Sequence, residues 1–328
     1  MVPEVRARIS PDHHWAIILA GGNGRRLQQT IVSWLGEDRP KQYCAFTGTR
    51  TMLQHTIDRA LALVRPDRLV TIVARNHLPF VRRAVRTPLP GIWIDQPRVC
   101  GTAPGVFLPL ARVLAQDPDA TVYLFPSDHF VHPEEPFLEL LRKAARVVDA
   151  RPERLVLIAA RPDRVDTDYG WLVPRGPEND EQRGRPWLAP VERFYEKPQQ
   201  ADAERLYRSG GLWNTMILIG KARTLWSAGV RSVPDVVARL SPLRRVWRAR
   251  QEVGDDGAGG DAEVRESVER IYDDLPRSDF SGHVLARSCA RLMALKLDGP
   301  VHWSDWGRFD RIAESLTALD RVPNFALK

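Results

Sequence analysis

The stretch that decides the fold is WAIILAGGNGRRL, residues 15–27. Its first six residues are all apolar, which is typical of a short strand buried on both faces of a sheet. A glycine-rich turn follows at once (residues 21–24), and Arg25 and Arg26 stand directly behind it. Glycines let backbone N–H groups approach a phosphate closely, and arginines supply positive charge. The stretch therefore predicts a strand that ends in a phosphate-binding loop, although an ordinary tight turn can have the same composition.

Beyond this loop, apolar runs alternate with amphipathic segments. We expect strands at residues 69–74, 92–94, 121–125 and 155–160, and helices at residues 51–64, 78–85 and 137–148. Thr51 and Gln54 form a capping box at the start of the first helix. A further helix begins at residues 101–104 with Thr102 as its N-cap, and Pro109 should kink or shorten it. This order predicts a mostly parallel sheet with helices on both faces.

The pattern changes in the second half of the chain. Strands are expected at residues 187–195 and 214–219, with short helices at 201–208 and 233–250. We expect a single domain over residues 12–310, with an α/β core at 15–228, a helical C-terminal subregion at 229–328 and a flexible glycine-rich loop at 252–262. The hexapeptide pattern of a β-helix is not found in the tail.

Charge and composition exclude several classes of function. The chain of 328 residues carries 48 basic and 41 acidic side chains, a net charge of +7. The arginines are scattered, without basic blocks or an aromatic RNA-binding motif, so a nucleic-acid partner is not expected. Apolar runs stay well short of the ~18 residues of a membrane span, and residues 1–14 lack the apolar core of a secretory signal. Three widely spaced cysteines fit a reducing cytoplasm.

A carboxylate follows the strand expected at residues 121–125. The sequence FPSDH (residues 125–129) places Asp128 at the carboxyl end of that strand, where ligands bind in open α/β sheets. An aspartate beside a phosphate-binding loop is a natural Mg²⁺ ligand, although a helix N-cap or turn would use the same residue. Two other phosphate motifs fail: the Lys-Ser/Thr of a Walker A loop is absent, and Leu27 replaces the third glycine of a dinucleotide fingerprint.

Together these segments resemble the sugar-1-phosphate nucleotidyltransferases, and within them the mannose-1-phosphate guanylyltransferases. The resemblance rests on eight segments in the family's order: LAGGNGRRL (19–27), PKQ (40–42), GTAP (101–104), PSDH (126–129), YG (169–170), FYEKP (194–198), WN (213–214) and WSDWG (303–307). They span nearly the whole chain. The GTAP, PSDH and WN segments point to the guanylyltransferase branch.

The resemblance implies a Rossmann-like nucleotidyltransferase fold of the GT-A-like α/β type, with a mixed, mostly parallel sheet, a helical C-terminal part and no β-helix. It implies that a sugar-1-phosphate, here mannose-1-phosphate, attacks the α-phosphorus of an NTP, here GTP, and releases pyrophosphate. The attacking phosphate is already ionised, so catalysis reduces to positioning and charge neutralisation. The implied partners are these small molecules, with neither nucleic acid nor membrane, and a homodimer is left open.

The resemblance also assigns roles to residues. It implies that Asp128 and Asp305 hold Mg²⁺. The implied catalytic residues are Arg26, Lys41, Asp128 and Lys197. The implied nucleotide-binding residues are Leu19, Ala20, Gly21, Gly22, Gly24, Arg26, Lys41, Gly101 and Thr102. The implied sugar-phosphate site consists of Gly170, Glu196, Lys197 and Asn214.

Three departures from the family pattern leave alternatives open. Twelve residues (28–39) lie between the glycine loop and PKQ; WNTM (213–216) replaces Trp-Asn-Ser-Gly, and SDFS (278–281) replaces Ser-Phe-Asp. One alternative is a guanylyltransferase for a different hexose- or heptose-1-phosphate. A second is a non-catalytic regulatory protein that binds a nucleotide sugar, which would be expected to lose one of the metal carboxylates or phosphate-binding lysines. A third is a nicotinamide-dependent oxidoreductase.

Overall fold

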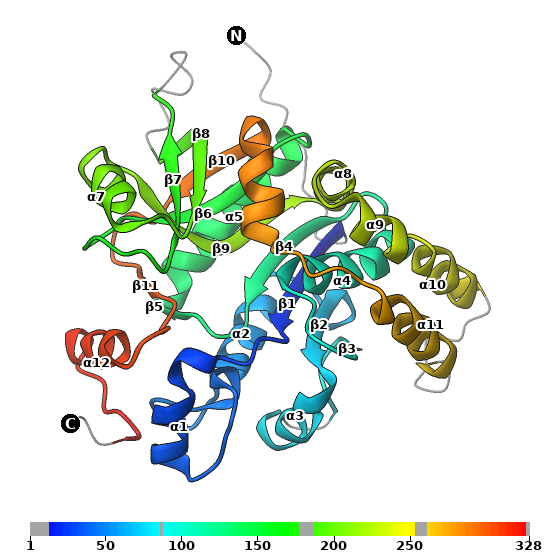
Figure 1. The fold of residues 1–328 in the computed structure, drawn as a ribbon, viewed down its shortest axis with the longest axis horizontal. Coiled ribbons are helices and arrows are strands. Elements are labelled where there is room, and N and C mark those ends of the chain that lie inside the picture. Colours follow the sequence, from blue (N-terminus) through cyan, green and yellow to red (C-terminus); the bar gives the residue numbers. More distant parts are fainter. Residues whose placement is uncertain (1–12, 86–87, 177–186, 253–260, 326–328) are drawn as a thin grey trace.

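A nine-stranded mixed sheet forms the centre of the computed structural model, which describes residues 13–85, 88–176, 187–252 and 261–325 (Figure 1). The strand order is β3-β2-β1-β4-β9-β6-β10-β8-β7, and β7 also pairs with β9. The strands are β1 (His14–Ala20), β2 (Leu69–Ala74), β3 (Ile92–Gln96), β4 (Thr121–Pro126), β6 (Leu155–Ala160), β7 (Gly170–Pro174), β8 (Leu188–Glu196), β9 (Leu212–Lys221) and β10 (Leu292–Lys296). A second, two-stranded sheet pairs β5 (Phe130–His132) with β11 (His302–Ser304).

The mixed sheet confirms the expected α/β class. Strands β3, β2, β1 and β4 are parallel to one another, as are β6 and β10. Strand β9 runs antiparallel to both β4 and β6, so it joins the two parallel parts. All residues of β2 and β4 are buried, as their uninterrupted apolar runs predict.

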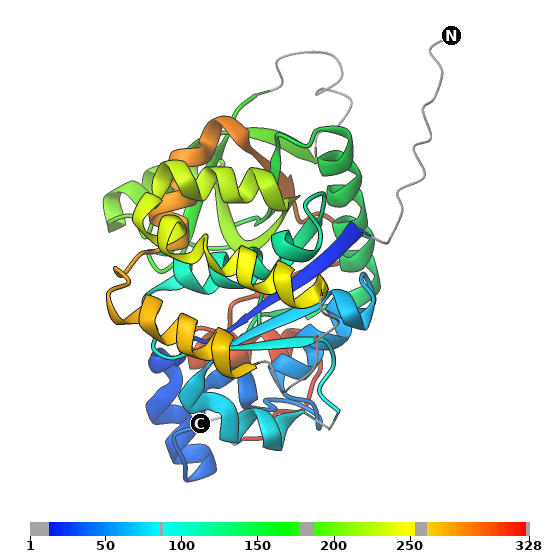
Figure 2. The same cartoon turned by 90° about the vertical axis from the view of Figure 1, so that its right-hand side faces the viewer.

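Helices cover both faces of the sheet (Figures 1 and 2). They are α1 (Gln28–Leu35), α2 (Met52–Leu61), α3 (Leu78–Ala84), α4 (Thr102–Gln116), α5 (Glu134–Ala150), α7 (Gln200–Arg208), α8 (Ala222–Ser232), α9 (Pro234–Leu240), α10 (Leu243–Glu252), α11 (Asp261–Asp273) and α12 (Phe309–Ala318). Successive residues of β1 point into different cores: Trp15 packs with α4 and α8–α11, whereas Ala16 packs with α2, α3, α5 and α7. None of the described helices has the length and apolar character that a membrane span requires.

The start of α2 confirms the predicted capping box, whereas the start of α4 differs from the prediction. The Gln54 N–H donates to Oγ1 of Thr51 (3.2 Å), and the Thr51 N–H donates to Oε1 of Gln54 (2.8 Å). The N-cap of α4 is Gly101, with Thr102 as the first helical residue. The helix continues past Pro109 to Gln116, so the proline does not shorten it.

The C-terminal part of the chain is less helical than expected. Strand β10 lies inside the main sheet between β6 and β8, so the α/β core is not confined to residues 15–228. The helix expected at residues 233–250 is two helices, α9 and α10, with Pro242 between them. A proline is disfavoured in the interior of a helix because it lacks an N–H group and clashes with the preceding turn. Most of the predicted flexible loop, residues 253–260, lies outside the described residues.

Residues 28–39 contain helix α1, which docks on the C-terminal helix α12. Ile31 of α1 is buried in one cluster with Ile312 and Leu316 of α12, and Trp306 belongs to the same cluster. The buried apolar residues of this segment thus belong to a core shared with the body of the protein. An ion pair between Arg26, which follows the glycine loop, and Asp305 joins the loop region to the WSDWG segment.

Candidate active site

The glycine-rich loop after β1 is held in place by the Pro-Lys-Gln segment. Nε2 of buried Gln42 donates to the backbone carbonyl oxygens of Ala20 (3.0 Å) and Gly22 (2.8 Å). Gly24 has φ of 61°, and a Cβ at this position would lie 3.0 Å from Cβ of Lys41. Glycine therefore permits both the backbone conformation and the close approach of the two segments.

Lys41 connects two acidic residues that are far apart in sequence. Its Nζ lies 2.8 Å from the Oδ2 atom of Asp128 and also donates to the backbone carbonyl of Asp305. The lysine is only 4% exposed. Asp128 follows β4, which is parallel to β1, so Asp128 and the glycine loop lie at the same edge of the sheet. The structure therefore places Lys41, Asp128 and Asp305 together beside the loop.

The side chain of Asp305 is surrounded by hydrogen-bond donors and cations. Its Oδ1 accepts from the Tyr169 hydroxyl (2.7 Å), Nη1 of Arg311 (2.8 Å) and the Gly307 N–H (3.0 Å). Its Oδ2 accepts from Nη2 of Arg26 (3.1 Å). The carboxylate is thus fixed from four directions, and only the Arg26 contact involves a side chain that is half exposed.

Arg311 of α12 organises this part of the site. It is 5% exposed, and it pairs with Asp305 and Asp166 and lies 3.5 Å from Asp168. Its guanidinium lies 4.6 Å from the ring centre of Tyr169. A buried guanidinium with these acidic partners holds the carboxylates in place, and Asp166 has no other ion pair among the described residues.

The cations around the two carboxylates keep them ionised. Burial alone would raise the pKa of Asp305, but Lys41 and Arg311 hold it well below its ordinary value. Burial likewise opposes ionisation of Asp128, and Lys41 holds its pKa below the ordinary value. Both groups therefore remain carboxylates at neutral pH.

Asp128 and Asp305 are the residues that could contribute ligands to Mg²⁺. Mg²⁺ prefers oxygen ligands and commonly takes one or two carboxylates together with substrate phosphates and water. Within the described ranges, no group of three or more His, Cys, Asp or Glu side chains is placed to hold a metal ion. Oδ2 of Asp305 is paired with Arg26, whose side chain is 52% exposed and also pairs with Asp168. The donor set therefore fits a magnesium ion shared with a phosphorylated ligand.

A second cluster lies around Glu196 at the end of β8. Gly170 is its cross-strand partner, and a Cβ on this glycine would lie 2.8 Å from Oε2 of Glu196. Asn214 on β9 is buried, and its Nδ2 lies 3.4 Å from Oγ of Ser281. Lys197 is exposed and has φ of 47°. The four residues assigned to the sugar phosphate are thus brought together, except that no contact fixes the Lys197 ammonium among the described residues.

The two clusters are joined through aromatic residues. Tyr169, which hydrogen-bonds Asp305, directly precedes Gly170 in the chain. Its ring centre lies 4.5 Å from that of Trp213, which directly precedes Asn214. The carboxylate cluster and the Glu196 cluster therefore form two parts of one site.

The pKa of Glu196 is raised to about 7, first by burial and then by the nearby Asp279. The ordinary value is 4.5, so the folded protein retains this proton at pH values where the unfolded chain has lost it. The free energy of unfolding should therefore fall as the pH rises from about 4.5 to about 7. Glu196→Gln should remove this pH dependence. The free energy of unfolding of the variant, relative to that of the wild type, should therefore be highest above pH 7.

Denaturant unfolding at pH 5 and pH 8 tests this prediction. The matched control is Glu192→Gln, which replaces an exposed carboxylate on the same strand. We expect the stability difference between Glu196→Gln and wild type to change between the two pH values, and that of the control to stay constant. If both differences are independent of pH, the environment of Glu196 described here is wrong.

The start of α4 packs against the segment with the sequence SDFS. The Ala103 N–H donates to the carbonyl oxygen of Ser278 (3.0 Å). The Thr102 hydroxyl donates to Asp279 (2.9 Å) and accepts from the Phe280 N–H (2.7 Å). Thr102 thus links α4 to this segment with its side chain, and Asp279 connects the segment to the Glu196 cluster.

Gly101→Ala should disturb this contact. Gly101 has φ of 91°, and a Cβ there would lie 2.3 Å from the carbonyl oxygen of Ser278. We expect a loss of about 1–3 kcal/mol in the free energy of unfolding, from the strained backbone and the clash. The control is Gly22→Ala, because a Cβ at Gly22 has nothing within 4 Å. Equal stability of the two variants in denaturant would contradict the tight packing at Gly101.

Sequence reasoning missed the residues that support the site. Gln42 lies in the quoted PKQ segment, and Tyr169 in the quoted YG segment, but neither was assigned a role. Arg311 and Asp166 lie outside every quoted segment, and their importance comes from contacts between distant parts of the chain. Gln96 was also missed: a Cβ on Gly21 would lie 2.1 Å from its Nε2 atom, so it packs directly against the glycine loop.

Comparison with known proteins gives one family and a consistent group of relatives. The family model described as "Nucleotidyl transferase" matches residues 15–320. The mannose-1-phosphate guanylyltransferase of Klebsiella pneumoniae is 28% identical over 67% of this chain and 45% of its own length. The alginate biosynthesis protein AlgA of Pseudomonas putida is 27% identical over 63% of this chain and 41% of its own length. The chain thus spans about half the length of the curated relatives it matches.

The structural neighbours agree with the sequence relatives. A solved structure from Thermus thermophilus, named a mannose-1-phosphate geranyltransferase, matches with a TM-score of 0.72 and 25% identity over 92% of this chain and 79% of that chain. A mannose-6-phosphate isomerase from Helicobacter pylori shares the fold with a TM-score of 0.64 at 17% identity, over 89% of this chain and 99% of that chain.

Proposed function

Because this chain belongs to the nucleotidyl transferase family, we propose that it transfers a nucleotidyl group from an NTP to a sugar-1-phosphate. We further propose that the NTP is GTP and the sugar phosphate is mannose-1-phosphate, so that the products are GDP-mannose and pyrophosphate. The activity would belong to nucleotide sugar biosynthesis.

The observation that carries this proposal is the position of Lys41. A buried ammonium joins Asp128 and Asp305 beside the glycine loop after β1. A buried charge destabilises the folded protein unless it is paired with an opposite charge or with a ligand. A lysine, two carboxylates and a glycine-rich backbone are the groups that a metal-bound triphosphate requires. Gln42 joins the lysine-bearing segment to the loop by two hydrogen bonds.

The reaction needs positioning rather than a general base. An oxygen of the sugar phosphate would attack the α-phosphorus of the NTP, forming one P–O bond while the bond to the departing pyrophosphate breaks. Arg26 and Lys41 would balance the charge of the triphosphate and the pyrophosphate, and Lys197 that of the sugar phosphate. Each cation stabilises the transition state most when the fold already holds it in position before the reaction begins.

The proposed magnesium ion would be held by Asp128 and Asp305. When bound, such an ion neutralises phosphate charge and aligns the reacting groups. Arg26 would then leave Oδ2 of Asp305 and turn toward the triphosphate. Its half-exposed position between Asp168 and Asp305 permits this movement.

The remaining residues would orient the sugar and the base. Glu196 and Asn214 would hydrogen-bond sugar hydroxyls, with Gly170 leaving room beside them. Gly101 and Thr102 would lie beside the base. Since the Thr102 hydroxyl already binds Asp279 and the Phe280 N–H, the contact of Thr102 with a nucleotide would use its backbone N–H.

The names of the relatives support guanosine and mannose as the substrates. Proteins named mannose-1-phosphate guanylyltransferase from Klebsiella pneumoniae and Escherichia coli both match at 28% identity. The chain also matches AlgA at 27% identity and XanB of Xanthomonas campestris at 25% identity. These matches leave a related hexose phosphate as an alternative substrate. A purely regulatory protein is disfavoured because Asp128, Asp305, Lys41 and Lys197 are all present.

A substrate panel tests the proposed specificity. Pyrophosphate release should be measured with four NTPs against mannose-, glucose- and heptose-1-phosphates. Sites that bind a substrate by hydrogen bonds reject analogues by up to about 10⁴-fold, so kcat/KM should be highest for GTP with mannose-1-phosphate. Equal kcat/KM with UTP or dTTP would reject the guanylyl assignment, and a preference for another sugar would reject mannose alone.

A further inference from the structure

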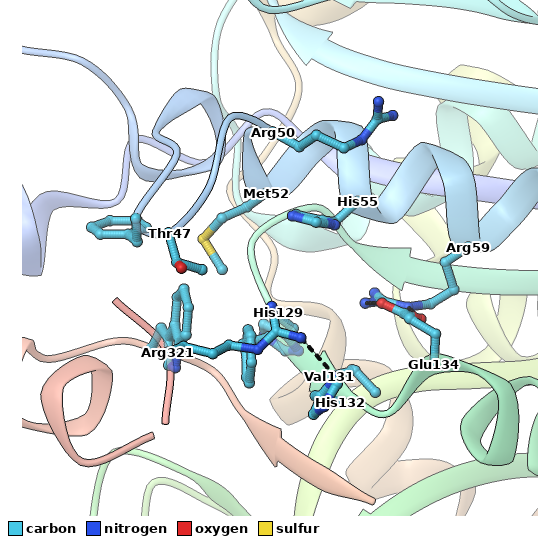
Figure 3. Close-up of a pocket in the computed structure, with 13 residues that line it drawn as sticks. Thr47, Arg50, Met52, His55, Arg59, His129, Val131, His132, Glu134 and Arg321 are labelled. Atoms are coloured by element: carbon cyan, nitrogen blue, oxygen red, sulfur yellow. Dashed lines mark hydrogen bonds and ion pairs between the residues drawn. The ribbon is translucent and has the colours of Figure 1, made fainter. Parts of the chain in front are cut away.

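We propose that a pocket between α2, β5 and the C-terminal segment is a second ligand site, which takes a phosphate monoester with an apolar body. Figure 3 shows His55 and Arg59 of α2, with Arg50 just before this helix, on one side of the pocket, and His132 of β5 and Arg321 on the other. None of its lining residues belongs to the groups assigned above to the nucleotide, the sugar phosphate or the metal.

Two buried donors in the wall of this pocket lack a partner among the described residues. Nη1 of Arg59 and Nε1 of Trp306 are buried and make no hydrogen bond there. The Arg59 side chain is 1% exposed, and its other two nitrogens bind Glu134 at 2.8 and 2.9 Å. A buried donor without an acceptor costs about 1–3 kcal/mol. Both residues line the pocket, so oxygen acceptors on a bound ligand are the groups that these donors lack.

The charge of the pocket favours an anion. Arg50, Arg59 and Arg321 line it, and Glu134 is the single acidic residue among the lining residues. Arg50 pairs with Asp58 outside the pocket, but both side chains are about half exposed, so this pair is weak. The Arg321 guanidinium has one described hydrogen bond, to Nδ1 of His132 at 3.1 Å.

Two histidines also line the pocket. Burial is the main cause that lowers the pKa of His55; Glu134 opposes the shift, whereas Arg59 and Arg50 add to it. Burial and Arg321 lower the pKa of His132, again against Glu134. The preference for an anion therefore rests on the three arginines and the two unpartnered donors.

The remaining walls are apolar and suit an organic group. They consist of Phe46, Met52, Phe130 and Val131 together with the Trp306 ring. Phe130 stacks on Trp306 with ring centres 4.3 Å apart and planes 8° apart. An inorganic ion would leave these surfaces without contact, whereas an ester would cover them.

The pocket also adjoins both carboxylates of the candidate active site. His129 in its wall directly follows Asp128, and Trp306 directly follows Asp305. Trp306 has φ of 43°, an uncommon conformation for a large side chain, so the position of its ring and of the Asp305 backbone are closely tied. A ligand that binds Trp306 would therefore influence the proposed metal site.

Equilibrium dialysis with labelled phenyl phosphate and, separately, inorganic phosphate tests this proposal without any enzymatic assay. The pocket variant is Arg50→Gln/Arg321→Gln. The matched control is Arg205→Gln/Arg208→Gln, which removes two exposed arginines from α7, far from the pocket in sequence. We expect one class of binding sites to weaken by about 10–100-fold in the pocket variant, from the loss of charged hydrogen bonds, and to be unchanged in the control.

The outcomes separate the sources of binding. Tighter binding of phenyl phosphate than of inorganic phosphate supports an ester, and equal binding supports recognition of the phosphoryl group alone. Identical isotherms for wild type and both variants would overturn the proposal, as would equal weakening in the two variants. Equal binding of phenol would also overturn it, because the pocket would then be apolar rather than anion-binding.

The indole N–H signal of Trp306 provides a second readout. In protein with ¹⁵N-labelled tryptophan, one of ten indole signals should shift with phenyl phosphate and should be absent in Trp306→Phe. If Trp306→Phe does not fold, the shift remains testable because it should require higher ligand concentrations in the pocket variant only. A ligand that binds by dialysis but moves no indole signal would place the site elsewhere.

Discussion

Asp128→Asn should reduce turnover by on the order of 10²–10³ while the protein keeps its fold, because one preorganised charge at the proposed metal is lost. Asp128 is partly exposed; within the described part of the chain it pairs with Lys41, and Nε2 of His129 lies 4.0 Å from its carboxylate. Lys41 retains its contacts to the backbone of residues 305 and 306. Asparagine has nearly the same shape as aspartate, so the substitution should change the charge at this position and leave the packing unchanged.

A binding measurement separates this prediction from a general loss of activity. Binding of Mn²⁺ in the presence of GTP, followed by electron paramagnetic resonance, should weaken in Asp128→Asn. The control is Asp163→Asn, an exposed aspartate whose pairing with Arg164 is on the surface. Full turnover or unchanged Mn²⁺ affinity in Asp128→Asn would remove this residue from the metal site.

Arg311→Met should lower the free energy of unfolding by about 3–5 kcal/mol, because it removes the described ion-pair partner of the largely buried Asp166 and one of the cations around buried Asp305. Asp305 and Asp166 each lose a direct partner, and both side chains are only 11% exposed. Arg164→Met is the matched control, since this arginine also pairs with two carboxylates, Asp163 and Glu314, at an exposed site. Its loss should cost less than about 1 kcal/mol.

The same variants show whether Arg311 positions Asp305 for the proposed metal. Arg311→Lys keeps the charge but loses the fork that contacts two acidic residues. We therefore expect it to fold and to require more Mn²⁺ for half-saturation than the wild type. If Arg311→Met is as stable as Arg164→Met, the ion pairs of Arg311 with Asp166 and Asp305 do not stabilise the fold as predicted.

Local sequence patterns predicted much of the fold because the decisive signals are local. The apolar run of β1 lies between two cores, and its alternate residues pack on opposite faces of the sheet. The Thr51–Gln54 capping box depends on residues three apart in sequence, so the start of α2 could be predicted. Strand β10 could not be placed, because its position between β6 and β8 depends on pairing with strands that lie about 100 residues or more earlier.

The candidate site divides in the same way. Lys41, Asp128 and Asp305 lie in recognisable segments, and the structure brings them together beside the glycine loop. Arg311 could not be found from the sequence, since an arginine on an amphipathic helix is ordinarily solvated. Only the folded chain turns α12 so that this residue is buried against Tyr169 and Asp305.

Thr102 shows why a residue's role can differ from its local pattern. A threonine at the start of a helix ordinarily caps it, but the Gly101 backbone occupies the N-cap position. The Thr102 hydroxyl binds residues 279 and 280 instead, more than 170 positions away. Tertiary contacts thus replaced the local hydrogen bond that the sequence predicted.

The proposed nucleotidyl transfer is tested most directly by following the α-phosphorus of the nucleotide. GTP labelled with ³²P at the α-position should be incubated with mannose-1-phosphate, Mg²⁺ and the purified protein. We expect label to enter a nucleotide sugar in amounts equal to the pyrophosphate released, and Asp128→Asn to slow both equally. Folded protein that transfers no label from any of the four NTPs to any sugar-1-phosphate of the panel would contradict the proposed reaction.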